Sequence, residues 1–160
     1  MKSITYGEVS LKQIVRIIDE YVSKNPNGDY QVIIGTDSQN FDKTKIVLVI
    51  AVLQVSKGGI FFYDISKVDR ISNIKQKLYK ETQMSLDCAT ELMTEFENYF
   101  DETGFDYTKL GFSIHVDAGM NGPTKEVIPE IVGWVKSMGY DVHVKPESFV
   151  ASTIADKYSK

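Results

Sequence analysis

The sequence has few of the residues that hold disulfide-linked and zinc-dependent proteins together. It contains one cysteine, Cys88, and two histidines. A single cysteine excludes an internal disulfide and fits a reducing cytoplasm, and so few nitrogen and sulfur ligands argue against a tetrahedral zinc site. No apolar run approaches the roughly 20 residues that span a bilayer, and the first residues lack the apolar stretch of a secretory signal. We therefore expect a cytoplasmic protein with no membrane segment.

Excess positive charge is also absent, because 18 lysines and arginines face 22 acidic residues and leave a net charge of −4. Proteins that bind polyanions usually present a basic face, so the total does not by itself point to nucleic acid. Acids gathered in one pocket would, however, leave the remaining surface less acidic than the sum. The 160 residues, 42% of them hydrophobic, suffice for one domain with a core, which we expect to cover residues 1–160.

Hydrophobic periodicity predicts an α/β fold. The expected helices cover residues 10–24, 73–100, 123–138 and 147–158, and the expected strands cover residues 31–37, 45–55, 60–65, 111–117 and 140–145. After an N-terminal helical extension in residues 1–27, the order is therefore βββαβαβα. A three-stranded meander followed by alternating helices and strands predicts a mixed five-stranded sheet with helices on both faces.

Glu81 falls where a charge is costly. At 100° per residue it lies in the middle of the apolar stripe of its helix, together with Leu78, Ser85 and Leu92. An ionised carboxylate buried without a partner is strongly destabilising. A bound cation would remove this penalty; the alternative is that Glu81 reaches solvent or pairs with a distant lysine.

Three further acids stand at positions where a site is expected. Asp37 and Asp117 each end a predicted strand, and the carboxyl ends of strands are where open α/β sheets place their sites. Asp156 shares a face of the closing helix with Ser152. The alternative for each of the strand acids is that it only begins a turn, and for Asp156 that it is exposed. Clustered carboxylates are oxygen ligands and suit Mg²⁺ or Mn²⁺.

Three segments resemble the YkuK-type bacterial proteins, a family classed as ribonuclease H-like. They are Ile-Gly-Thr-Asp-Ser-Gln at 34–39, His-Val-Asp-Ala-Gly-Met-Asn-Gly at 115–122, and Ser-Phe-Val-Ala-Ser-Thr-Ile-Ala-Asp-Lys-Tyr-Ser-Lys at 148–160. The resemblance runs from about residue 28 to residue 160. It implies a ribonuclease H-like fold whose order of acids is matched by Asp37, Glu81, Asp117 and Asp156, and a nucleic-acid phosphodiester, DNA or RNA, as the substrate class.

The first functional hypothesis is a two-metal nuclease. Asp37 would bridge two Mg²⁺ or Mn²⁺ ions, with Glu81 and Asp117 on one ion and Asp156 on the other. Free amides in the turn before Pro123, at the start of the third predicted helix, could meet a phosphate. The candidates for substrate binding are Ser38, Asn121, Gly122 and Ser152.

Two other hypotheses belong to different functional classes. The first is a module that binds nucleic acid or a nucleotide without hydrolysing it. The second is one half of a sugar-kinase or actin-type ATPase, for which 160 residues leave no room for the duplicated domain. The exposed faces of the N-terminal helix are a candidate surface for a homodimer.

Overall fold

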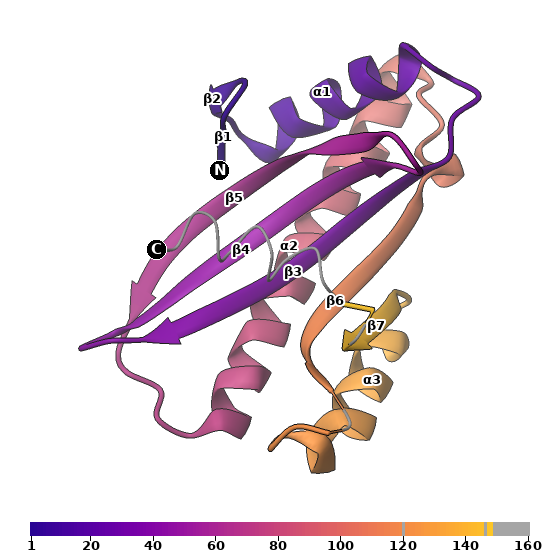
Figure 1. Ribbon diagram of the computed structural model, residues 1–160. Coiled ribbons are helices and arrows are strands. Elements are labelled where there is room, and N and C mark those ends of the chain that lie inside the picture. The colour runs from indigo at the N-terminus through magenta and orange to yellow at the C-terminus, as the bar shows by residue number, and fades with distance from the viewer. Residues whose placement is uncertain (120, 146, 149–160) are drawn as a thin grey trace.

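The computed structural model describes residues 1–119, 121–145 and 147–148 (Figure 1). Within these residues one sheet carries three α-helices and two short 3-10 turns. The strands are β1 (Lys2–Ser3), β2 (Gly7–Glu8), β3 (Tyr30–Asn40), β4 (Thr44–Gln54), β5 (Gly58–Val68), β6 (Gly111–Gly119) and β7 (Asp141–Lys145). The helices are α1 (Leu11–Ser23), α2 (Ile74–Thr103) and α3 (Ile128–Ser137), and the 3-10 turns are η1 (Tyr107–Lys109) and η2 (Lys125–Val127).

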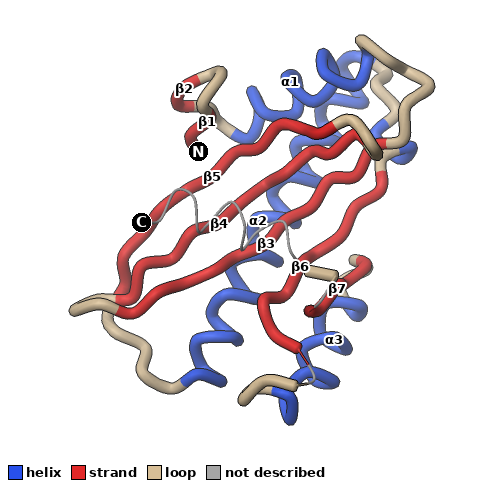
Figure 2. The backbone as a smooth tube through the Cα atoms, viewed as in Figure 1, coloured by secondary structure: helices blue, strands red, loops and turns tan. Residues whose placement is uncertain are grey.

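The strands lie in the order β2-β1-β5-β4-β3-β6-β7 (Figure 2). The meander of β3, β4 and β5 is antiparallel, whereas β6 runs parallel to β3 and β7 runs parallel to β6. The mixed sheet and its five predicted strands are confirmed. The predicted strand count is wrong, because the described residues form seven strands. The two extra strands, β1 and β2, have two residues each, too few to show an alternating pattern. The N-terminal extension is therefore a small hairpin followed by a helix.

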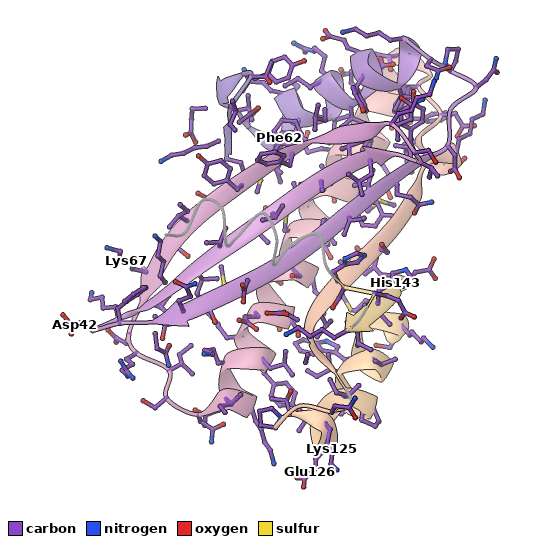
Figure 3. The ribbon with its side chains drawn as sticks, in the orientation of Figure 1. Asp42, Phe62, Lys67, Lys125, Glu126 and His143 are labelled. Atoms are coloured by element: carbon purple, nitrogen blue, oxygen red, sulfur yellow. The ribbon has the colours of Figure 1, made fainter. Side chains whose placement is uncertain are left out.

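The three described helices share one buried apolar cluster with one face of the sheet, and α2 lies behind the sheet in Figure 1. Helix α1 begins at a capping box in which Ser10 and Gln13 exchange hydrogen bonds. Its side chains Ile14 and Ile18 are fully buried in the same cluster as Phe62 of β5, which lies between α1 and the sheet (Figure 3). None of the helices within the described ranges is both long and apolar enough to cross a membrane.

The opposite face of the sheet is also apolar. Ile33, Val47, Val49 and Ala51 form a second buried cluster there. Burial on both faces explains why β4 is a nearly continuous apolar run instead of an alternating one. Helices were predicted on both faces, but those in the described part of the chain cover only the first. Of the predicted helix over residues 147–158, residues 147 and 148 are not helical and the others lie outside the described residues.

Helix α3 was predicted to begin at Pro123 and in fact begins at Ile128. A proline in the first turn is a good signal for a helix start, but the proline that fills this position is Pro129. Pro123 belongs to a turn in which the Lys125 amide donates to the Gly122 carbonyl oxygen at 3.2 Å. This turn is placed beside the end of β6, where it forms part of a cavity wall.

Candidate functional site

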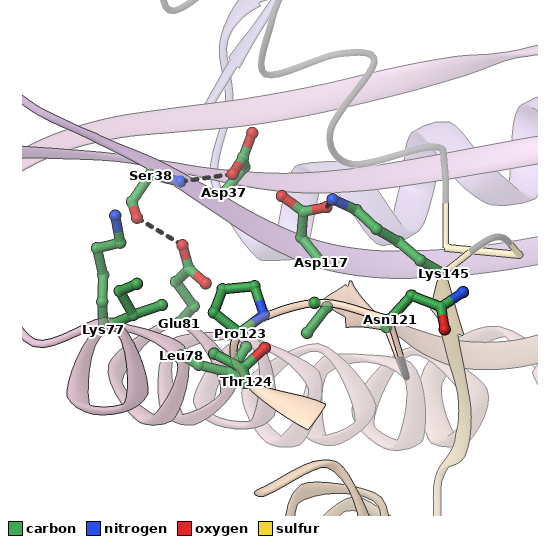
Figure 4. A pocket seen from close by; sticks show the side chains of 14 residues that line it. Asp37, Ser38, Lys77, Leu78, Glu81, Asp117, Asn121, Pro123, Thr124 and Lys145 are labelled. Atoms are coloured by element: carbon green, nitrogen blue, oxygen red, sulfur yellow. Dashed lines mark hydrogen bonds and ion pairs between the residues drawn. The ribbon is translucent and has the colours of Figure 1, made fainter. Parts of the chain in front are cut away.

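Two acidic residues directly follow the last paired positions of the neighbouring parallel strands β3 and β6. Both strands continue beyond these acids, to Asn40 and Gly119, so the prediction that each acid ends its strand is wrong. The pairing of β3 with β6 runs from Gln31 opposite Gly111 to Thr36 opposite Val116. The next residues along the two strands are Asp37 and Asp117. Both line a cavity of about 580 Å³ (Figure 4), whose walls also include Ser38, Ile74, Lys77, Leu78, Glu81, Ala118, Gly119, Asn121, Gly122, Pro123, Thr124 and Lys145.

Glu81 reaches the same cavity from helix α2. Its side chain is 8% exposed, which confirms the prediction that it faces the sheet. Desolvation is the main reason that its pKa rises from 4.5 to about 8, and the negative charges of Asp37 and Asp117 raise the pKa further. A hydrogen bond from the Ser38 hydroxyl and the charge of Lys77 act in the opposite direction. Glu81 is therefore mostly protonated at neutral pH in the protein without bound cations.

Hydrogen bonds fix β3 against α2 around the cavity. The Ser38 hydroxyl donates to Glu81 Oε1 at 2.5 Å, and the Ser38 amide donates to Asp37 Oδ1 at 2.9 Å. Ser38 thus links the strand acid to the helix acid (Figure 4). Two residues before Ser38, the hydroxyls of Thr36 and Ser85 lie 2.7 Å apart in the buried interface between strand and helix. These contacts position the two carboxyl groups on opposite walls of one cavity.

Asp117 forms an ion pair with Lys145, the last residue of β7. The Lys145 Nζ lies 3.0 Å from Asp117 Oδ1, and the lysine side chain is 57% exposed while that of the aspartate is 18% exposed. The hydrogen bond with Asp117 is the main cause that raises the pKa of Lys145. The sequence analysis did not single out this lysine. The signal that could have identified Lys145 is its place at the end of β7, the strand that follows β6 and its Asp117.

The remaining predicted site residues have different outcomes. Ser38, Asn121 and Gly122 line the cavity. The Gly122 amide donates to the Gly119 carbonyl oxygen at 3.1 Å, and the helix expected at Pro123 is absent there. Of the turn amides expected to be free, that of Gly122 is therefore already bonded, and the turn does not lead directly into a helix. Asp156 and Ser152 lie outside the described residues.

The donor atoms at this cavity fit a hard divalent cation in kind. Three carboxyl groups line it, and Mg²⁺ and Mn²⁺ prefer oxygen ligands. Asp117 already holds a cationic group, the Lys145 ammonium. In the part of the chain that the structure describes, however, no three acidic, histidine or cysteine side chains are gathered closely enough to hold one ion. Asp37, Glu81 and Asp117 thus share a cavity without forming a closed coordination shell.

The family model described as "Ribonuclease H-like" matches residues 13–160. The chain belongs to the ribonuclease H-like family. It is also 29% identical over 167 residues to "Uncharacterized protein YkuK" of Bacillus subtilis (strain 168), covering 99% of this chain and 95% of the relative. The resemblance of this ribonuclease H-like chain to the YkuK-type proteins is thereby confirmed.

Among solved structures, this ribonuclease H-like chain is similar to the Mos1 transposase catalytic domain, in a structure with raltegravir and Mg. The similarity covers 84% of this chain and 62% of that one, with 8% sequence identity and a TM-score of 0.28. A likeness this distant carries no argument about the site.

Proposed function

We propose that the protein is a Mg²⁺- or Mn²⁺-dependent phosphodiesterase that hydrolyses nucleic acid. The observation that carries the proposal is the shared cavity of Asp37, Glu81 and Asp117, next to the last paired residues of β3 and β6. The ribonuclease H-like family supports this proposal through the fold. In that fold, the strand ends are the place where side chains from several elements reach one substrate.

The three described acids have distinct environments and so distinct roles in the proposal. Asp37 is only partly buried and lies on β3, three residues before that strand ends, and in the proposal it is the acid shared between two ions. Asp117 and Glu81 flank it from β6 and α2, and Asp156 supplies the fourth carboxylate. Bound divalent ions would lower the pKa of the attacking water and stabilise the leaving oxygen of the phosphodiester. A cation next to Glu81 would also favour its ionised form, because opposite charge offsets desolvation.

The substitution Asp37→Asn tests the proposal, because it keeps the size of the side chain and removes its charge. Purified wild type and variant are assayed on labelled single-stranded, duplex and hybrid DNA and RNA, with Mg²⁺, with Mn²⁺ and with a chelator. We expect metal-dependent cleavage by the wild type and a loss of at least about 100-fold in the variant, since even removal of a residue that supports a metal ligand costs 10- to 100-fold.

Asp42→Asn is the matched control. Asp42 is exposed on the turn between β3 and β4, five residues beyond Asp37, and does not line the cavity (Figure 3). Its substitution removes the same charge and should leave cleavage unchanged. Cleavage that survives Asp37→Asn at the wild-type rate would refute the assignment of the active site.

A non-catalytic module that binds nucleic acid or a nucleotide is the second candidate. The observation in its favour is that no closed shell of three ligands exists among the described residues, while Lys145 already occupies Asp117. It predicts metal-independent binding of an oligonucleotide without turnover on any of the substrates above. Metal-dependent cleavage that Asp37→Asn abolishes would exclude it.

A further inference from the structure

Lys145 lies beside Asp117 at a place where the pairing of β6 with β7 is irregular. His115 of β6 pairs with His143 of β7, and regular parallel pairing would then place Lys145 opposite Asp117. Instead the register shifts, and Lys145 pairs with Gly119. Irregularities of this kind re-aim side chains and are common beside active sites. Here the shift falls on the stretch of β6 that contains Asp117.

The residue that pairs with Lys145 is a glycine. A Cβ atom added at Gly119 would stand 3.0 Å from the Cβ of Lys145 and 3.4 Å from its carbonyl oxygen. A side chain at position 119 would therefore require Lys145 to give way by a few tenths of an ångström. From this position the Lys145 Nζ reaches the cavity and lies 3.0 Å from Asp117 Oδ1 (Figure 4).

The charges around the cavity show what this lysine does there. Lys145 interacts with Asp117 first, and also with Asp37 and Glu81, the other two acids of the cavity. Its ammonium thus compensates the same group of carboxyls that would receive a divalent ion. A divalent ion on the same carboxylate would repel the ammonium over a few ångströms, so the two cations compete for Asp117.

The lysine is also free to leave without disturbing the core. Its side chain is 57% exposed, and a lysine ammonium on a flexible four-carbon stem can turn to a new anion at little cost. A phosphodiester that enters the cavity brings the negative charge that the displaced ammonium requires.

We propose that the Lys145 ammonium holds the cation position on Asp117 until a divalent metal ion displaces it, and that the displaced ammonium then binds a phosphate of the substrate. This inference rests on the proposed function, because it requires a metal ion at Asp117. Lys145 thus opposes binding of the metal ion at Asp117 and links metal binding to binding of the nucleic acid.

The first measurement is the affinity of the full chain for Mn²⁺ alone, by calorimetry or by the electron paramagnetic resonance of free Mn²⁺. We expect Lys145→Met to bind Mn²⁺ about tenfold more tightly than the wild type, equivalent to about 1.4 kcal/mol. Lys145→Arg keeps the cation and should bind like the wild type. Lys136→Met is the matched control, since Lys136 is an exposed lysine on α3 that does not line the cavity. It should also bind like the wild type.

The second measurement is the affinity for a fluorescent single-stranded 12-mer, with Ca²⁺ in place of Mn²⁺ to suppress cleavage. We expect Lys145→Met to weaken this binding severalfold when Ca²⁺ is present and to have little effect with a chelator. Equal weakening in both conditions would mean that Lys145 contacts the oligonucleotide without any exchange, and would overturn the coupling.

The Asp117→Asn background separates the two proposals. If Lys145 acts at Asp117, its replacement no longer tightens Mn²⁺ binding once Asp117 is neutral. If Asp117→Asn weakens Mn²⁺ binding while Lys145→Met leaves it unchanged, the metal site stands and the role of Lys145 is refuted. If neither the wild type nor Lys145→Met binds Mn²⁺ at millimolar concentration, the metal site itself fails, and the inference fails with it.

Discussion

Glu81→Gln should stabilise the folded protein, but only at pH values above 4.5, the ordinary pKa of a glutamate. Burial raises the pKa of Glu81 from 4.5 to about 8 in the folded protein. The folded state therefore keeps a proton that the unfolded state releases between these two values. The contribution of Glu81 to folding stability therefore falls as the pH rises through this window, and this contribution is constant below and above it. Glutamine cannot ionise, so the variant is free of this loss.

The size of the effect follows from the shift. At about 1.4 kcal/mol per pKa unit, the change corresponds to an upper value of about 5 kcal/mol at pH 8.5 and above. At pH 5 the wild-type carboxyl is protonated in the folded state, and the variant should differ from it by no more than about 1 kcal/mol. The advantage of the variant should therefore grow by several kcal/mol between pH 5 and pH 8.5.

Urea unfolding of both proteins at pH 5, 7 and 8.5, in buffer with a chelator, measures this difference. Other titrating groups cancel because the two proteins share them. Glu97→Gln on the same helix is the control, since Glu97 is exposed and its substitution should give a difference that does not depend on pH. A stability difference for Glu81→Gln that is equal at pH 5 and pH 8.5 would refute the reasoning that burial holds this carboxyl protonated.

Two further predictions concern stability and are checked by the same urea titrations. Ser85→Ala removes the 2.7 Å hydrogen bond to Thr36 and should cost about 1–3 kcal/mol of folding stability. The cost should be smaller when Thr36→Val removes the other partner as well, so additive costs of the two substitutions would contradict the prediction. Gly59→Ala places a Cβ 2.2 Å from the carbonyl oxygen of Val52 and should cost about 1–3 kcal/mol or more, whereas Gly133→Ala in α3 meets open space and should stabilise by about 0.5–1 kcal/mol. Equal effects of the two alanines would show that the contact at Gly59 relaxes freely.

Elements with a strong repeating pattern could be predicted from the sequence. Helix α1 was placed within one residue at each end, because Ser10 supplies a clear cap and the apolar spacing is regular. The start of α2 was placed to the residue before its first helical position, where Asn73 is the N-cap. The 100° spacing also placed Glu81 correctly toward the sheet. Strands of two residues and the choice between two nearby prolines carry no such repetition, so β1, β2 and the start of α3 could not be found.

Some residues of the candidate site could be predicted from the sequence in the same way. Asp37 and Asp117 were expected at one edge of the sheet because each ends an apolar run, and they do line one cavity. Lys145 was not assigned to it, because the pattern of a single strand does not say which residue of β6 the lysine lies beside. Periodicity within one strand contains no information about its register against another. Contacts across the ends of strands are therefore the part of a site that the chain pattern leaves open.

The charges that line the cavity explain why a bound cation would lower the electrostatic cost of its acidic side chains. Asp117 has an ammonium partner, but the main polar partner of Glu81 is the neutral hydroxyl of Ser38. In the folded protein Glu81 therefore stays mostly protonated at neutral pH. Keeping this proton lowers the free energy of unfolding, a cost that a glutamine would avoid. A group that destabilises the fold beside two further acids is expected where function requires it. A divalent ion bound beside Glu81 would oppose the effect of its burial and favour the ionised form.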